Sequence, residues 1–215
     1  MTEKPFKALL VEGTSGVGKS TLIDALIRRH TSGSKPKKIR TLLHLAQSHT
    51  YGPLATPEDK GTLTVDENVR HLERIVTLLE WLHAGVQEHS RPWCFVLIDT
   101  LHLTHCVRPG VVKWQDVAVF DRRLAALECG LLFLQTSPAT IWERGIQPRQ
   151  NDQFLVEYAR KFGSTDEEKH AYFVREQETM AGLFSSSTMH KLLLNSEHTL
   201  EATRDEATAF WIDRQ

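Results

Sequence analysis

The fold of this chain is decided by the stretch Gly13-Thr14-Ser15-Gly16-Val17-Gly18-Lys19-Ser20. It fits the phosphate-binding pattern G-x-x-x-x-G-K-[ST] at every fixed position. Its three glycines allow the backbone to bend so that successive N–H groups point at phosphate oxygens. The Lys19 ammonium can reach the terminal phosphates of a nucleotide, and the Ser20 hydroxyl can bind Mg²⁺. This stretch therefore predicts a site for a nucleoside triphosphate, with ATP and Mg²⁺ as the expected cofactors.

The residues on either side of the motif fit a strand–loop–helix unit. Phe6 to Val11 form a mostly apolar run typical of a buried strand, and Thr21 to His30 favour a helix. The N-terminus of that helix would add the positive end of its dipole to the anion site. We therefore expect nucleotide contacts from Gly13, Ser15, Gly16, Val17, Gly18, Lys19, Ser20 and Thr21.

The composition is that of an ordinary globular domain with nearly balanced charge. The chain has 215 residues, a net charge of −1 and three cysteines without C-x-x-C spacing. Proteins that bind a nucleic acid polymer usually have a basic excess, and sparse cysteines fit a reducing compartment. No apolar run approaches the length of a membrane span, and no signal peptide is apparent. These features predict a single cytoplasmic domain over residues 1–215, without a nucleic acid polymer or a membrane as partner.

Strand and helix signals alternate along the chain, which favours a parallel sheet covered by helices on both faces. We therefore expect an α/β fold with three α/β/α layers around a five-stranded parallel sheet. A polar stretch from Ala46 to Thr64 contains Gly-Pro and Thr-Pro breakers and is expected to form a long loop. The expected strands are 6–11, 39–45, 93–98, 130–135 and 191–194, and the expected helices are 21–30, 66–89, 116–127, 138–144, 154–162, 166–183 and 200–211.

Two acids stand where strands of the predicted sheet end. Glu12 directly precedes the phosphate-binding loop and can accept a proton from a substrate hydroxyl, unless it is a surface acid that tunes the loop. Asp99 follows a buried apolar run, at the position of an acid that holds Mg²⁺ directly or through water. A carboxylate there is costly unless a cation or hydrogen bonds satisfy it. We predict that Glu12 is catalytic and that Asp99, with Ser20, serves the metal or proton transfer.

Two arginines flank a short segment after the fourth predicted strand. Arg144 and Arg149 bracket Gly145-Ile146-Gln147-Pro148. Two guanidinium groups on a flexible segment can close over a transferring phosphate, neutralise its charge and exclude water. We therefore predict a lid at about residues 145–165 with both arginines as catalytic residues, the alternative being an exposed polar loop.

The stretch Val11-Glu12-Gly13-Thr14-Ser15-Gly16-Val17-Gly18-Lys19-Ser20-Thr21 resembles the opening of thymidylate kinases and deoxynucleoside kinases. This resemblance implies a P-loop kinase fold, and it implies a general-base role for Glu12. In these kinases the acid at the end of the third strand is followed by an arginine, whereas Thr100 follows Asp99 here. Either Arg108 or Arg70 replaces that arginine, or the acceptor is chemically different. The resemblance also implies pairing of two chains through a long helix such as Asp66 to His89.

The acceptor is expected between the loop after the second strand and the long helix. Gln47 can bond a base edge and Tyr51 can stack on it, while Arg70 lies at the start of the helix. His102 and His105 leave the sheet at its ligand-binding edge and are predicted to line the cleft. Together with Cys106 they also suit Zn²⁺, although no second ligand pair at finger-like spacing accompanies them. Trp81, in the middle of the helix, is expected to be a core residue.

These features predict an ATP-dependent small-molecule kinase that transfers the γ-phosphoryl group to a nucleoside or nucleotide. The alternatives are a kinase for another metabolite or an antibiotic hydroxyl, a nucleotide-dependent switch or ATPase without an acceptor, and a degenerate kinase that binds nucleotide without turnover. An arginine lid favours a kinase, whereas a guanine-reading Asn-Lys-x-Asp motif, typical of GTP switches, is missing.

Overall fold

The computed structural model describes residues 6–31, 40–88, 93–108, 111–147 and 160–212. Five parallel strands form one sheet in the order β2-β3-β1-β4-β5. Because β1 lies in the centre between β3 and β4, the segments that follow these three strands meet at one edge of the sheet. The strands are β1 (Phe6–Glu12), β2 (Arg40–Leu45), β3 (Trp93–Asp99), β4 (Gly130–Gln135) and β5 (His190–Asn195).

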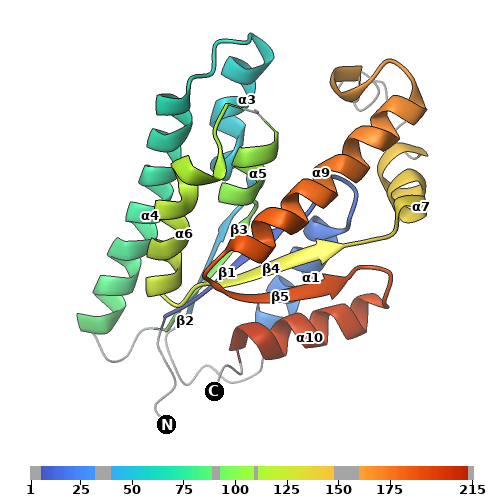
Figure 1. Cartoon of the computed structure of the whole chain (residues 1–215). Helices are drawn as coiled ribbons and strands as arrows, with labels where there is room; N and C mark the ends of the chain where they lie inside the picture. Colours follow the sequence, from blue (N-terminus) through green and yellow to red (C-terminus); the bar gives the residue numbers. More distant parts are fainter. Residues whose placement is uncertain (1–5, 32–39, 89–92, 109–110, 148–159, 213–215) are drawn as a thin grey trace.

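Helices cover both faces of this sheet, which confirms the predicted α/β/α layers (Figure 1). On one face lie α1 and α10, and on the other lie α4, α6 and α9. None of the helices within the described ranges is long and apolar enough to cross a membrane. The helices are α1 (Lys19–Thr31), α2 (Gln47–Thr50), α3 (Gly52–Asp59), α4 (Val65–Glu88), α5 (His102–Val107), α6 (Trp114–Ala126), α7 (Pro138–Ile141), the π-helix η1 (Trp142–Ile146), the 3-10 helix η3 (Arg160–Phe162), α9 (Asp166–Ser186) and α10 (Leu200–Ile212).

The alternation of side chains along the central strands decides which face each residue serves. Leu9 and Val11 pack in the core under α1 and α10, whereas Ala8 and Leu10 pack in the core under α4 and α6. The two cores are closed by large fully buried side chains such as Trp211. Burying each such side chain contributes about 1.5–3 kcal/mol.

The polar stretch between β2 and α4 differs from its prediction as a loop, since it forms α2 and α3. Pro53 lies in the first turn of α3, where the absence of its N–H costs nothing. The prediction for Trp81 is also wrong. On α4 it is 70% exposed, because the core-facing stripe is carried by neighbours such as Leu72, Val76 and Leu79.

Candidate active site

The phosphate-binding loop leaves β1 at Glu12 and enters α1 at Lys19, so that it spans the centre of the sheet's carboxyl edge. Gly13, Gly16 and Gly18 have φ angles of 149°, 83° and 98°, a region that side-chain-bearing residues rarely adopt. Ser20 and Thr21 are exposed in the first turn of α1. The predicted nucleotide contacts therefore share one loop, with Val17 as the member whose side chain is buried in the core.

Lys19 folds back onto its own loop. Its Nζ donates hydrogen bonds to the carbonyl oxygens of Gly13, at 2.7 Å, and Thr14, at 3.0 Å. Burial lowers the pKa of Lys19 to about 8, and the positive charge of Arg108 contributes to the same shift. An ammonium held by carbonyl oxygens inside a ring of backbone amides is ready to exchange these partners for phosphate oxygens.

Asp99 ends β3 with its carboxylate towards the α1 side of the sheet, the side on which Phe95 and Leu97 are buried. The residue is 7% exposed, and its Oδ1 has no hydrogen-bond partner within the described residues. Burial raises the pKa of Asp99, while the nearby charges of Lys19, His44 and Arg108 oppose that shift. A buried carboxylate oxygen without a partner is costly, and a metal ion or a metal-bound water removes that cost.

The surroundings of Glu12 differ from those expected of a general base. The residue is fully buried, and its Oε1 accepts hydrogen bonds from the backbone N–H groups of Leu101, at 2.8 Å, and Leu103, at 3.2 Å. Its Oε2 accepts from the Thr104 hydroxyl at 2.6 Å. Glu12 thus caps the N-terminus of α5, where a carboxylate is stabilised by N–H groups that have no partner within the helix and by the helix dipole. This arrangement does not favour contact with a substrate hydroxyl, and Asp99 becomes the better-placed acid.

Thr100, which stands in place of the expected arginine, has a φ angle of 60°. That conformation costs a β-branched residue on the order of 1–3 kcal/mol. The Thr100 N–H donates to Val11 O at 3.0 Å, and Thr50 and Thr100 both donate their hydroxyls to Asp99 O. These bonds hold the chain in a sharp turn directly after Asp99, and they leave the Thr100 side chain buried.

The residues predicted to contact the acceptor do not all reach the surface of the cleft. Gln47 begins α2 half-buried, and its backbone N–H bonds the Asp99 carboxylate. Tyr51 is buried with its ring against His105, and its hydroxyl donates to Glu58. Arg70 is exposed on α4. Gln47 therefore lies at the carboxyl edge of the sheet, whereas the ring of Tyr51 is covered by its own neighbours.

His102 and His105 are fully buried on α5, and both bond protein groups. His102 Nε2 lies 3.1 Å from Asp121 Oδ1. His105 Nε2 lies 2.9 Å from Thr50 O, and its Nδ1 lies 2.7 Å from the Asn68 amide. Burial lowers the pKa of His105 to about 3. The two rings therefore join α5 to α4 and α6, and this geometry does not favour the prediction that they contact a substrate directly.

Of the two predicted lid arginines, Arg144 lies in η1, and Arg149 lies outside the described residues, as does most of the segment 145–165. Arg144 is exposed and donates from Nη1 to Ser196 O at 3.0 Å. Gly145 of the same π-helix packs on the phosphate-binding loop, where a Cβ built on it would lie 3.3 Å from Ser15 O. Such π-helical turns occur frequently at functional sites.

Residues that sequence reasoning did not assign also meet the loop. Glu176 of α9 is buried and accepts a hydrogen bond from the Thr14 hydroxyl through one oxygen and from Arg108 Nε, at 3.1 Å, through the other. Nothing in the pattern of the α9 sequence distinguishes Glu176 from its many charged neighbours. His44 of β2 lies near the Asp99 charge, and nothing in the pattern of the β2 sequence distinguishes it either.

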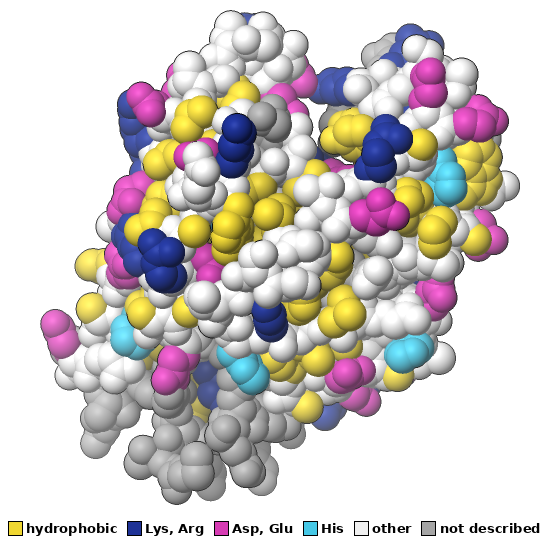
Figure 2. All heavy atoms as spheres, viewed as in Figure 1, with side chains coloured by type: hydrophobic (Ala, Val, Ile, Leu, Met, Phe, Trp, Pro, Cys, Tyr) yellow, Lys and Arg dark blue, Asp and Glu magenta, His cyan; other side chains and the backbone are white. Residues whose placement is uncertain are grey.

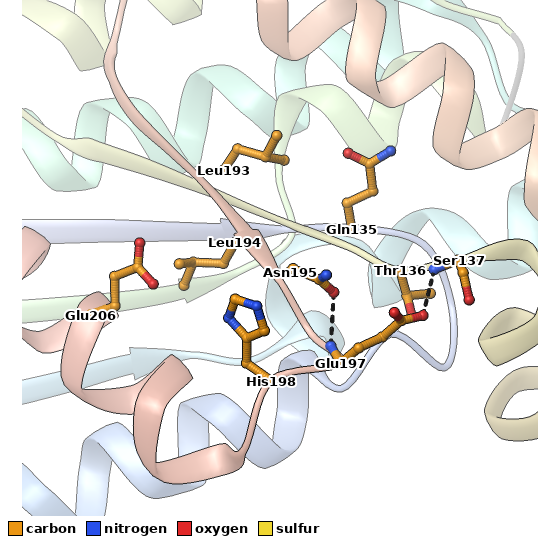
Figure 3. A pocket seen from close by; sticks show the side chains of 9 residues that line it. All are labelled: Gln135, Thr136, Ser137, Leu193, Leu194, Asn195, Glu197, His198 and Glu206. Carbon is orange, nitrogen blue, oxygen red and sulfur yellow. Dashed lines mark hydrogen bonds between the residues drawn. The ribbon is translucent and has the colours of Figure 1, made fainter.

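A pocket of about 440 Å³ opens beside the carboxyl ends of β4 and β5 (Figure 3). Glu197 closes one side by accepting hydrogen bonds from the Ser137 N–H and the Thr140 hydroxyl. Hydrogen bonding by the Ser137 side chain, and then by Thr140 and the Ser137 N–H, lowers the pKa of Glu197 to about 2. Farther across the molecule, the surface is hollowed between α3–α5 and the unit of α7 with the start of α9 (Figure 2). The carboxyl edge of the sheet thus lies below a cleft with a pocket to one side.

The residues present fit a magnesium nucleotide. The loop amides and Lys19 suit phosphate oxygens, and Ser20 at the helix start together with the unpartnered Asp99 oxygen suits Mg²⁺, which prefers oxygen ligands. The fold around this site is a P-loop kinase-like fold.

Solved structures of known proteins are similar to this chain in fold. The YorR protein of Bacillus subtilis, solved in complex with phosphorylated GDP, is 12% identical, with 94% of each chain covered and a TM-score of 0.56. A sugar kinase from Janibacter sp. is 16% identical, with 97% of this chain and 95% of the other covered and a TM-score of 0.49. Deoxyadenosine kinase from M. mycoides with bound dATP is 13% identical, with 94% and 97% covered and a TM-score of 0.48. The chain matches no known family model, and no curated protein matches it in sequence.

Proposed function

We propose that this protein is an ATP-dependent kinase that transfers a phosphoryl group to a small acceptor, with a nucleoside or nucleotide as the leading class. The observation that carries the proposal is the meeting of Lys19 and Asp99 at the start of α1. Each is buried close to the other's charge, and Lys19 Nζ bonds carbonyl oxygens of the loop whose amides suit a polyphosphate.

In this proposal the protein contributes to catalysis mostly by positioning the reactants and by stabilising charge. The loop amides hold the phosphates of the donor in line with the acceptor. The Lys19 ammonium stabilises the negative charge that develops on the terminal phosphates. Mg²⁺, when bound, neutralises phosphate charge, and Ser20 and Asp99 are the residues that would hold it. In the sequence after β4, Arg144 directly precedes the predicted lid and Arg149 lies within it.

A nucleoside or nucleotide acceptor is supported by two features. The cleft at the carboxyl edge is bordered by α2, where half-buried Gln47 offers an amide that can pair with a base edge. The YorR structure, whose fold this chain shares, was solved with phosphorylated GDP. We also infer, from the kinase resemblance alone, that two chains pair through α4, which sedimentation of the purified protein will test.

A coupled assay of ADP release with a panel of nucleosides, nucleotides, sugars and aminoglycosides tests the proposal. We expect nucleotide consumption that depends on one acceptor class and on Mg²⁺, with Lys19→Ala as the inactive control. Triphosphate consumption at the same rate with and without every acceptor would instead assign an ATPase or switch. Binding without any consumption would indicate a degenerate kinase.

A further inference from the structure

Two hydrogen-bonded steps connect Arg108 to the phosphate-binding loop. Its Nε donates to Glu176 Oε1 at 3.1 Å, and Glu176 Oε2 accepts from the hydroxyl of Thr14, the second residue of the loop. The side chains of Arg108 and Glu176 are 7% and 2% exposed. A buried pair of this kind is retained only when both charges find well-placed partners.

Arg108 follows the last turn of helix α5, and the first turn of this helix is also anchored to the loop. Glu12, directly before the loop, caps the first turn of α5, and the N–H of Arg108 bonds Thr104 O at the last turn. Helix α5 is therefore held at its start by the residue before the loop and at its end through the Arg108–Glu176–Thr14 contacts. This arrangement fixes where the guanidinium lies relative to the phosphate-binding amides.

The charge of Arg108 reaches the catalytic groups. It adds to the lowering of the Lys19 pKa by burial and opposes the rise that burial causes in the Asp99 pKa, which places the guanidinium in their electrostatic neighbourhood. Arg70, the other candidate replacement for the arginine missing at Thr100, is exposed on α4 and has its resolved electrostatic effect on Glu67. The geometry thus separates the two candidates.

We propose that Arg108 contacts the terminal phosphate of the bound triphosphate, in place of the arginine expected after Asp99, and that Glu176 positions its guanidinium. This inference rests on the proposed function. A guanidinium carries five N–H donors in a planar fork, a geometry that suits carboxylate and phosphate oxygens alike. The Thr14 hydroxyl bonds Glu176, so the position of Glu176 is coupled to that of the loop. Helices α5 and α9 and the loop therefore act as one phosphate-binding unit.

The test compares binding of a non-hydrolysable ATP analogue with binding of ADP, each with Mg²⁺, by calorimetry. We expect Arg108→Met to weaken the triphosphate analogue by about 10- to 100-fold, the size of a lost charge-assisted hydrogen bond, and ADP by less than about threefold. Arg108→Lys keeps the charge but loses the fork, and it should fall between. Arg122→Met, on the exposed face of α6, is the matched control and should change neither affinity.

Loss of a buried charge partner can unfold the protein, so the double variant Arg108→Met with Glu176→Gln keeps the pair neutral and serves as the second probe. In that folded background the triphosphate preference should still be lost. Equal weakening of both nucleotides, or no weakening of either, overturns the role of Arg108 while leaving the proposed function intact. Failure of the wild-type protein to bind either nucleotide overturns the proposed function, and the role of Arg108 falls with it.

Discussion

Gly16 of the phosphate-binding loop and Gly145 of η1 lie in direct backbone contact, so that a Cβ built on Gly16 would stand 2.6 Å from Gly145 Cα. Gly16 also has a φ angle of 83°, which a side chain makes costly. The loop and the segment that leads into the predicted lid therefore touch at a point where only hydrogen fits.

Gly16→Ala is expected to push these two segments apart and to weaken nucleotide binding by more than about tenfold, because loop amides then miss their phosphate oxygens by a fraction of an ångström. Gly182→Ala is the matched control. It lies in α9 with open space around the added Cβ and should stabilise the protein by about 0.5–1 kcal/mol. Calorimetric affinities and thermal unfolding of both variants check this, and unchanged affinity in Gly16→Ala would contradict the packing.

The lowered pKa of Lys19 predicts proton uptake on nucleotide binding. Its pKa is about 8 in the free protein, and phosphate oxygens favour the charged ammonium, so binding should raise that pKa. Affinity should then fall as pH rises above that value, and protons should be taken up between that value and the pKa of the bound form. Titrations in two buffers of different ionisation enthalpy measure the uptake, which should disappear in Lys19→Met.

Asp99→Asn should make the free protein more stable while removing the magnesium dependence of nucleotide binding. The pKa of Asp99 is raised, so the folded protein holds that proton more tightly than the unfolded chain and loses stability as pH rises above the ordinary value of 3.8. The Asn variant lacks this loss and should gain on the order of 1 kcal/mol at neutral pH.

Denaturant titrations across the acidic range measure this gain. It should vanish below the ordinary aspartate pKa, and Asp24→Asn, exposed on α1, should show none of it. A destabilised Asp99→Asn variant at neutral pH would show that the carboxylate is satisfied in the free protein.

Glu12→Gln is expected to destabilise the fold. An amide cannot accept the Thr104 hydroxyl and two backbone N–H groups as the carboxylate does, and lost bonds to a charged group cost about 1.5–3 kcal/mol. Thermal unfolding checks this against Glu88→Gln, exposed at the end of α4. A Glu12→Gln variant of full stability that has lost turnover would restore Glu12 as the general base.

The fold was readable from the sequence because its signals are local. The phosphate-binding motif fixes a strand, a loop and a helix, and continuous apolar runs such as 93–98 mark buried parallel strands. The stretch after β2 was misread because Gly52-Pro53 serves equally well as a breaker and as the first turn of a helix.

The site was harder to predict because it depends on which face of a strand each side chain takes. Glu12 shares the parity of Ala8 and Leu10, which face α4 and α6, whereas Asp99 shares the parity of Phe95 and Leu97, which face α1. Counting alternate positions would have separated the two acids. The contact of Glu176 with Thr14 joins residues that are 162 positions apart, so no local sequence pattern predicts it.

The most direct test of the central claim is calorimetry of the folded protein with a nucleoside triphosphate and Mg²⁺. The account predicts one binding site per chain that is lost in Lys19→Ala, while the variant stays folded. Triphosphate uptake that is unchanged by Lys19→Ala, or no uptake by the wild-type protein, would contradict it.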